Sequence, residues 1–286
     1  MNTKNILFTT LALLSMCATC VWAKESGVIL ACETYSLRTH LNEGKIDFIT
    51  VMDLMKQLGI KGIALNDIWM KSYDEAYLEK IKQSAKKNGI TIVALICEGN
   101  LVTADEAARK RQMEENTQKM RAAAYLGARV IRFNLGSTGK AEEDATVGVD
   151  RAIEAFNKLL PLAKRLNLKM TIENHGGVSG TADNIIRIIK STDPKYVGAC
   201  LDFKNWPAQS MYEENAKLAP YAYHTHAKSL EFDARGEETT VDYGRILKML
   251  KSAGYKGAIS IEYEGSGDEI EGIKKTRDLI LKYYKF

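Results

Sequence analysis

The sequence predicts a single (β/α)8 barrel, a closed ring of eight parallel strands surrounded by helices. Short β-branched apolar runs alternate with longer amphipathic stretches from one end of the chain to the other. Eight such pairs in a chain of 286 residues match the usual size of this fold. The chain has only four prolines and no proline- or serine-rich linker, which indicates one domain rather than two.

The strands are expected at eight apolar runs, each bounded by polar or glycine-containing segments. These runs span residues 27–33, 60–66, 90–98, 128–136, 168–175, 196–202, 221–228 and 257–265. Apolar residues recur at helical spacing between them, as Ile46, Ile49 and Met52 do in the segment 46–59. Four of the helical segments end in a glycine just before the next strand, which is typical of helix C-termini: Gly59, Gly89, Gly127 and Gly254.

An open, doubly wound sheet is the alternative architecture for alternating strands and helices. That fold normally carries a glycine-rich phosphate-binding turn after its first strand. Here the first strand continues into CETYSLRTH (residues 32–40), which contains no glycine. The barrel is therefore favoured.

Residues 1–23 have the features of a secretory signal peptide. Lys4 precedes an apolar run that is too short for a stable membrane span, and VWA (residues 21–23) resembles a small-residue cleavage site. We therefore expect an exported, periplasmic protein whose barrel domain spans residues 24–286. Cys17 and Cys20 leave a lipid anchor as the alternative, although the residues before them make poor lipoprotein cleavage sites.

The composition excludes several classes of protein. Hydrophobic residues make up 45% of the chain and charged residues 27%, which suits a large folded core. The net charge is +4, but Lys and Arg are scattered among Asp and Glu, so the chain has no nucleic-acid-binding patch. No later apolar run is long enough to cross a membrane. Cys32, Cys97 and Cys200 lie in apolar runs and are expected to be buried thiols. The sequence leaves open whether the chain forms a homo-oligomer.

Ionisable residues gather at the ends of the last four predicted strands. Side chains alternate between the two faces of a strand, so isoleucines and leucines facing the helices leave their neighbours facing the barrel interior. This alternation directs the following residues inward: Glu173, His175, Asp202, His224, His226, Lys228, Ser260, Glu262 and Glu264. The carboxyl ends of barrel strands form the rim where active sites lie.

Three carboxylates at one rim repel each other unless a positive charge lies between them. A divalent cation supplies that charge, and the best set of ligands is Glu173, Asp202, His226 and Glu262. Three hard oxygen ligands and one imidazole suit a single Mn²⁺ or Mg²⁺, with Co²⁺ or Zn²⁺ as alternatives. A structural cluster of ion pairs is the other interpretation of these residues.

At these residues the chain resembles the sugar isomerase/epimerase superfamily with the xylose-isomerase-like barrel, which includes ketose 3-epimerases and inositol-catabolism enzymes. The resemblance covers nearly all of the chain after the signal peptide. Its marks are IENH on the fifth strand, LD on the sixth, HTHAK on the seventh and IEYEG on the eighth. It implies that Glu173, Asp202, His226 and Glu262 bind one divalent metal, and that Glu173 and Glu262 also act as the acid/base pair.

Two positions depart from the ketose 3-epimerase pattern. Asn205 stands where those enzymes usually have a histidine, and Phe232 stands where they usually have an arginine. A ketohexose 3-epimerase is therefore not the expected activity. The trinuclear-zinc endonucleases that resemble this fold need more histidines than the four in this chain.

Further residues are expected to support the reaction or to contact a sugar. Lys228 and His175 are the candidate electrophilic or proton-donating groups, with ion pairing to the ligand carboxylates as the alternative role. Trp69 and Trp206 follow strands and could stack on sugar C–H surfaces or cap the core instead. The remaining candidates for hydrogen bonds to the substrate are Asn66, Glu98, Arg132, Asn134, His224 and Asn205.

The expected substrate is an unphosphorylated carbohydrate. The loop that follows the last strand, residues 262–272, is acidic and would repel a phosphate. The expected reaction is proton removal beside a sugar carbonyl, as in an isomerase or epimerase. Two alternatives stay open: a lyase that cleaves 3-keto-glycosides by β-elimination, and a barrel that binds a carbohydrate without catalysis.

Overall fold

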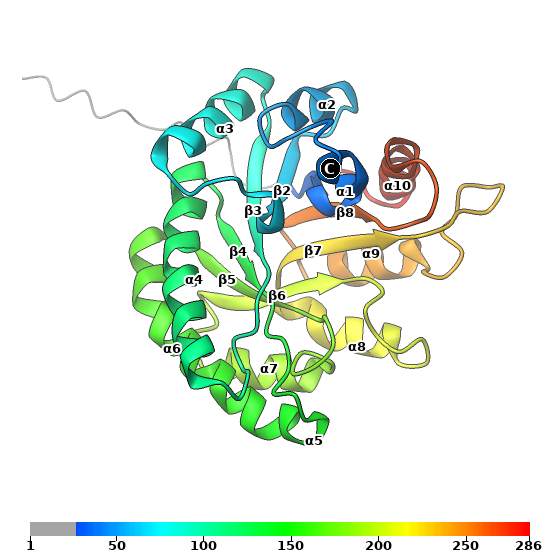
Figure 1. Ribbon diagram of the computed structural model, residues 1–286. Coiled ribbons are helices and arrows are strands. Elements are labelled where there is room, and N and C mark those ends of the chain that lie inside the picture. The colour runs from blue at the N-terminus through cyan, green and yellow to red at the C-terminus, as the bar shows by residue number, and fades with distance from the viewer. Residues whose placement is uncertain (1–26) are drawn as a thin grey trace, which may run out of the picture.

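The eight predicted strands form one closed parallel barrel (Figure 1). A computed structural model describes residues 27–286, and the predicted signal peptide lies outside this range. Each strand pairs with the next along the chain, and β1 pairs with β8 to close the ring. The strands are β1 (Ile29–Glu33), β2 (Gly62–Asn66), β3 (Thr91–Cys97), β4 (Val130–Phe133), β5 (Lys169–Glu173), β6 (Val197–Asp202), β7 (Ala222–Ser229) and β8 (Ala258–Tyr263). The barrel prediction is confirmed.

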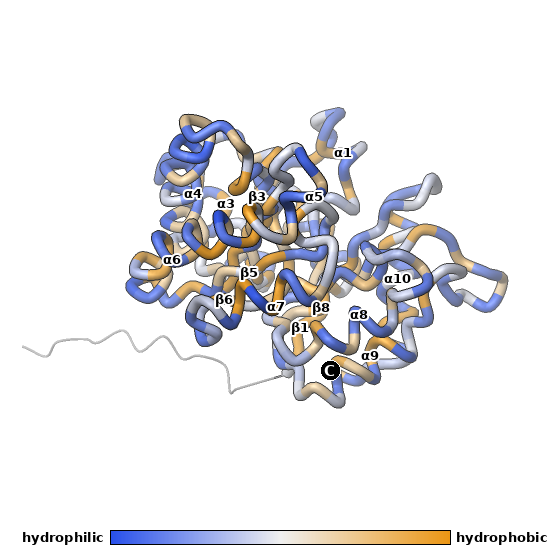
Figure 2. The backbone as a smooth tube through the Cα atoms, turned by 90° about the horizontal axis from the view of Figure 1, so that it is seen from below, coloured by the Kyte–Doolittle hydropathy of each residue, from blue (hydrophilic) through white to orange (hydrophobic). Residues whose placement is uncertain are grey.

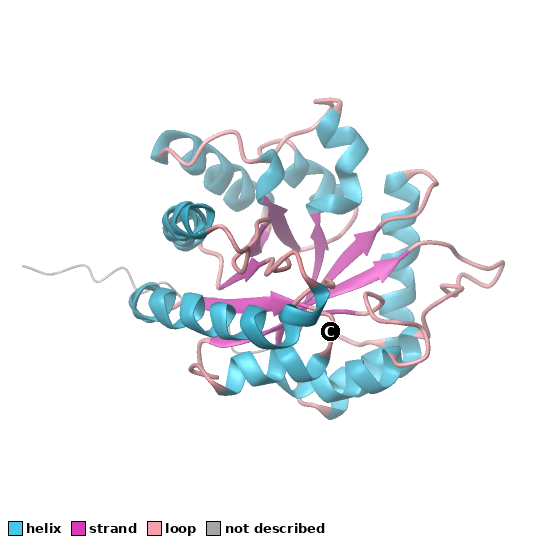
Figure 3. Cartoon of the chain, turned by 60° about the horizontal axis from the view of Figure 1, so that its bottom comes forward, coloured by secondary structure: helices cyan, strands magenta, loops and turns pink. Residues whose placement is uncertain are grey.

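Helices surround the strands as an outer layer (Figure 3). The α-helices are α1 (Arg38–Asn42), α2 (Val51–Gln57), α3 (Glu75–Asn88), α4 (Glu106–Leu126), α5 (Ala141–Glu143), α6 (Val149–Leu166), α7 (Ala182–Lys190), α8 (Met211–Leu218), α9 (Tyr243–Ser252) and α10 (Glu269–Tyr283). Short turns of other helix types are η1 (Thr34–Leu37), η2 (Asp67–Trp69), η3 (Asp144–Gly148) and η4 (Ala219–Tyr221). Within residues 27–286, no helix combines the length and the apolar character that crossing a membrane requires.

The helix ends follow the predicted glycine pattern. Gly59, Gly89, Gly127 and Gly254 all have positive φ, between 68° and 84°. A residue with a Cβ rarely adopts this conformation, so the glycines allow the chain to leave the helix and enter the next strand. Asn167 has the same role at the end of α6, where its φ is 50°. This helix end was not predicted, because no glycine marks it in the sequence.

The hydrophobic core has two parts. In Figure 2 hydrophobic segments lie along the strands and along parts of the surrounding helices. The larger part lies between the strands and the helices. The smaller part fills the barrel interior with mostly small side chains: Ala31, Ala64, Val93, Ala94, Ile96, Val130 and Ala258. As predicted, Cys32, Cys97 and Cys200 are buried free thiols. The small residues fill the interior on the side of β1 to β4, which leaves the carboxyl ends of β5 to β8 for polar groups.

Candidate functional site

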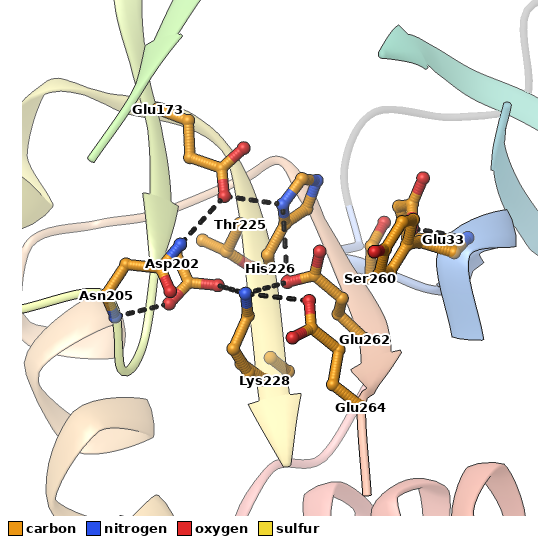
Figure 4. Close-up of polar contacts among 12 residues, drawn as sticks. Glu33, Glu173, Asp202, Asn205, Thr225, His226, Lys228, Ser260, Glu262 and Glu264 are labelled. Carbon is orange, nitrogen blue, oxygen red and sulfur yellow. Dashed lines mark hydrogen bonds and ion pairs between the residues drawn. The ribbon is translucent and has the colours of Figure 1, made fainter. Parts of the chain in front are cut away.

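Four residues predicted to bind a metal come together at the carboxyl ends of strands β5 to β8 (Figure 4). Glu173 ends β5 and Asp202 ends β6, while His226 lies in β7 and Glu262 in β8. One potential ligand atom from each residue lies within 4.8 Å of the others, and all four residues are buried. Apolar residues such as Ile172 alternate with them and pack against the helices, as the strand pattern predicted.

Several atoms of this set are buried without a hydrogen-bond partner. They are Asp202 Oδ2, Glu262 Oε2 and both ring nitrogens of His226. His226 Nδ1 lies 3.2 Å from Glu173 Oε1 and 3.6 Å from Glu262 Oε2, so the imidazole faces both carboxylates. A buried polar atom without a partner is costly, and a divalent cation bound by these lone pairs removes the cost. The four residues therefore fit a divalent metal ion.

The segment after β6 orients Asp202. The backbone N–H groups of Lys204 and Asn205 both donate to Asp202 Oδ1, each over 2.7 Å, which leaves Oδ2 free to face the site. Asn174 exchanges two hydrogen bonds with the backbone of Asp202 and ties the ends of β5 and β6 together. The Asn205 side chain donates to Glu173 Oε1 over 3.3 Å. Asn205 thus lies beside the acidic set.

Burial and mutual repulsion shift the acids of this set in different directions. Burial raises the pKa of Asp202 to about 8, with Glu262 and Glu173 adding to the effect and Lys228 opposing it. Burial likewise raises the pKa of Glu262, against the opposing charges of Lys228 and His226. Burial would raise the pKa of Glu173 too, but the adjacent guanidinium of Arg132 holds it well below its usual range. The nearby positive groups therefore do not fully offset the cost of burying these carboxylates.

Lys228 supplies positive charge beside the carboxylates. Its Nζ lies 2.9 Å from Glu264 Oε1, 3.3 Å from Glu262 Oε2 and 3.5 Å from Asp202 Oδ2 (Figure 4). The side chain is only 7% exposed, so these ion pairs are weakly screened. The ammonium is therefore fixed close to two of the candidate metal ligands.

Arg132 links the acidic set to the earlier strands. Its guanidinium contacts Glu173 Oε2 over 2.5 Å and Glu98 Oε1 over 2.7 Å, and it is 3% exposed. Asn134 donates to the other oxygen of Glu98 over 2.8 Å. Glu98, Arg132 and Asn134 were predicted to contact a sugar, and the structure brings all three together in one hydrogen-bonded network beside Glu173.

Two other predicted site residues belong to β2 and the turn after it, and they differ in how deeply they are buried. Asn66 is buried at the end of β2, and its side chain accepts a hydrogen bond from the Ile68 N–H. Trp69 is half-buried on the rim, where its ring lies 5.9 Å from that of Tyr35 and its N–H donates to Asn42. These two residues end or follow β2.

Three further predicted residues lie outside the set of four, although a ring nitrogen of His224 lies within 4.8 Å of a ring nitrogen of His226. Trp206 is buried in the outer core, with its indole N–H donating to Asn215, so it caps the core. His224 is fully buried within β7, where Ser260 Oγ lies 3.1 Å from its Nε2. His175 is exposed, two residues beyond the end of β5.

Sequence reasoning missed Glu33 at the end of β1. The side chain is fully buried and faces the barrel interior, because Ala31 lies in the interior core while Cys32 packs against the helices. The alternation of side chains that identified Glu173 applies equally to the ACE tripeptide at residues 31–33.

Comparison with known proteins identifies the family. A model of the xylose isomerase-like TIM barrel family matches residues 52–283, which is most of the chain. The chain belongs to this family. The match includes strands β2 to β8 and all four candidate metal ligands, so the resemblance seen in the sequence motifs is confirmed.

Curated relatives match the chain over short stretches. The C-glycoside deglycosidase alpha subunit of Arthrobacter globiformis is 33% identical over 75 residues, which is 24% of this chain and 21% of that protein. The 3'-dehydrocarminate deglycosidase alpha subunit of a Microbacterium species is 42% identical over 53 residues, which is 18% of this chain and 15% of that protein. The chain thus matches about a fifth or less of the length of these relatives.

Solved structures confirm the fold at low sequence identity. The D-psicose 3-epimerase of Clostridium cellulolyticum superimposes with a TM-score of 0.75 at 15% identity, covering 91% of this chain and 100% of the other. The 3-keto-D-glucoside 4-epimerase of E. coli gives a TM-score of 0.66 at 15% identity, covering 82% and 94%. At this level of identity the comparison establishes the barrel architecture.

Proposed function

We propose that the protein is a divalent-metal-dependent enzyme that removes a proton beside the carbonyl of an unphosphorylated sugar, in the manner of an isomerase or epimerase. The observation that carries the proposal is the set of buried, unpartnered ligand atoms of Asp202, His226 and Glu262, which face Glu173. The family and its sugar epimerase structures support the same class of substrate.

Glu173, Asp202, His226 and Glu262 would hold the ion. A divalent metal there would supply Lewis-acid polarisation of a sugar carbonyl. Mn²⁺ or Mg²⁺ suits the three carboxylates best, with Co²⁺ or Zn²⁺ as alternatives. The backbone N–H groups of Lys204 and Asn205 hold Asp202 Oδ1 in place, which leaves Oδ2 free for the ion.

Glu262 and Glu173 would transfer the protons. Glu262 Oε2 has no hydrogen-bond partner and can take a proton from carbon, whereas Glu173 Oε2 is already paired with Arg132. Glu173 Oε1, which faces His226, would first take up the proton of a substrate hydroxyl and then give it to the second carbon, while Glu262 passes its own proton to the former carbonyl oxygen. Lys228 lies within 3.3 Å of Glu262 and can stabilise negative charge that develops on a substrate oxygen.

A second candidate function is the β-elimination of 3-keto-glycosides. The curated relatives that are named deglycosidases favour it. In this reaction a glutamate takes the proton beside the ketone, the bond to the aglycone breaks and the aglycone leaves with a proton. The same four ligands and two glutamates would serve, so the first step is shared with the isomerase.

One experiment separates these functions. The metal content of the purified protein is measured, and the protein is then incubated in D2O with free keto-sugars and with a 3-keto-glucoside of a chromogenic phenol. Solvent deuterium in a product that keeps all its substituents supports an isomerase or epimerase. Release of the phenol, without deuterium in any free sugar, supports the lyase instead. Sugar binding with neither outcome supports a barrel that binds carbohydrate without catalysis.

We also propose that the protein is exported and acts in the periplasm. The support is the signal-like sequence of residues 1–23, which lies outside the described residues. Sequencing the N-terminus of protein from the native host tests the proposal. A mature N-terminus near residue 24 agrees with export, whereas an intact Met1 in the cytoplasmic fraction contradicts it.

A further inference from the structure

Glu33 is a further carboxylate at the same end of the barrel. It ends β1, and strand pairing brings Cys32 opposite Ile261 of β8, so Glu33 lies at the level of Glu262 on the neighbouring strand. Both side chains face the barrel interior. In Figure 4 Glu33 lies next to Ser260, while Asp202 and Glu173 lie on the other side of Glu262.

One oxygen of Glu33 has a structural role and the other has none. Oε2 accepts a hydrogen bond from the Tyr35 N–H over 2.5 Å and thereby caps η1. Oε1 is buried without any hydrogen-bond partner. Among the described residues, no lysine, arginine or histidine forms an ion pair with Glu33. A glutamine would cap η1 equally well, so the cap does not explain a buried carboxyl group.

Burial of Glu33 is costly because its charge lacks a direct partner. Burial raises the pKa of Glu33 to about 7, although the positive charges of His226 and Arg132 and the Tyr35 N–H partly oppose that effect. Proteins seldom bury an unpaired carboxyl group unless a ligand or a reaction uses it.

Glu33 does not belong to the metal-binding set. Its carboxylate is absent from the group of four residues whose ligand atoms lie within 4.8 Å of one another. It also lies on β1, which is directly across the barrel from β5 and Glu173. Its free oxygen therefore lies outside the set of metal ligands.

We propose that Glu33 is a substrate-contacting residue, and that its free Oε1 forms a hydrogen bond with a hydroxyl group of the sugar bound beside the metal ligands. This inference rests on the proposed function, because it assumes that a sugar occupies this space. Oε1 requires a ligand with a polar hydrogen at this position, which a polyhydroxylated sugar provides. Glu33 then selects substrates by one hydroxyl group and leaves proton transfer to Glu173 and Glu262.

Three variants test the role of Glu33. Glu33→Gln keeps the η1 cap and still offers a polar group to a hydroxyl, which can either donate or accept. Glu33→Met has a similar length but offers no hydrogen bond. Asp74→Asn is the control, because it changes the acidic N-cap of α3 on the exposed surface. All proteins are loaded with Mn²⁺, and their metal content is measured first.

Binding and turnover are then measured with D-fructose, D-psicose, xylitol and a 3-keto-glucoside. We expect Glu33→Met to keep its metal and to lose roughly 10- to 100-fold in affinity or kcat/KM, the usual effect of removing a hydrogen bond to a charged group. Glu33→Gln should stay within about tenfold of the wild type, and the control Asp74→Asn should match the wild type. The loss in Glu33→Met should appear mainly in KM.

Other results overturn the inference in distinct ways. A loss of kcat in Glu33→Gln of roughly 100-fold or more, with KM unchanged, would make Glu33 a proton-transfer group. Loss of bound metal in both Glu33 variants would make it a ligand. Wild-type behaviour of Glu33→Met would leave Glu33 without a role in the site. If the wild-type protein binds and converts none of the probes, the proposed function fails, and the role of Glu33 fails with it.

Discussion

Replacing Glu33 with glutamine should stabilise the protein at neutral and alkaline pH. The carboxyl group is fully buried, and its pKa rises from an ordinary value of 4.5 to about 7 on folding, chiefly through burial. One pH unit corresponds to roughly 1.4 kcal/mol, so ionising Glu33 costs the folded state about 3 kcal/mol. Glutamine has no charge to bury and still accepts the hydrogen bond from the Tyr35 N–H.

The sign of this effect defines its pH window. Because the folded protein binds the proton more tightly than the unfolded chain, stability falls as the pH rises from 4.5 to about 7. We therefore expect Glu33→Gln to exceed the wild type by about 1 kcal/mol at pH 5 and by about 3 kcal/mol at pH 8. Below pH 4 the carboxyl group is protonated in both states, and the advantage should disappear.

Urea unfolding of EDTA-treated protein, followed by circular dichroism between pH 5 and pH 8, measures the difference. EDTA is needed because a nearby metal ion would lower the pKa of Glu33 and reduce the effect. Asp74→Asn, at the exposed N-cap of α3, is the control for removing an acidic cap elsewhere. Curves for wild type and Glu33→Gln that stay parallel across this pH range would refute the argument.

Three further predictions concern the metal ligands and their neighbours. Asp202→Asn should reduce the metal content from about one ion per chain to nearly none, whereas the surface variant Asp233→Asn should retain it; equal metal content in both would remove the site. Glu262→Gln should lower kcat at least ~100-fold in protein shown to contain metal, and near-normal turnover would favour a binding protein without catalysis. Arg132→Met should destabilise the fold by about 3–5 kcal/mol, because it leaves Glu173 buried without its partner. An unchanged urea midpoint for Arg132→Met would show that Asn205 and His226 compensate.

Most of the fold followed from local patterns in the sequence. Strands of a closed parallel barrel are short and apolar, and a glycine such as Gly89 marks the end of a helix, so both signals are visible without tertiary contacts. The short turns were not predicted, because η1 depends on the cap that Glu33 provides and η3 has no comparable signal. All eight strands were predicted to begin one or two residues too early, whereas their C-terminal ends were correct for β1, β2 and β6, one to three residues too late for β3, β4, β5 and β8, and one residue too early for β7.

Site residues could be predicted where the alternation of side chains along a single strand decides which of them face the barrel interior. Glu173 and Glu262 were placed inward by the isoleucines beside them, and the structure agrees. Contacts between strands depend on register, which no single sequence pattern provides. Arg132 was expected to contact a sugar, but the pairing of β4 with β5 places it against Glu173. The sequence also left open whether Trp206 lies on the rim or in the core, because this depends on contacts between elements.

The two halves of the chain contribute differently to the carboxyl end of the barrel. All four candidate metal ligands come from β5 to β8, whereas the first half contributes the charged neighbours Glu33, Glu98 and Arg132. The second half therefore carries the reacting centre, and the first half carries groups that surround it. A library of variants restricted to positions such as 33 and 98 would alter the surroundings of a ligand while leaving the four metal ligands intact. Evolution of new specificities in such a barrel can proceed in one half of the chain alone.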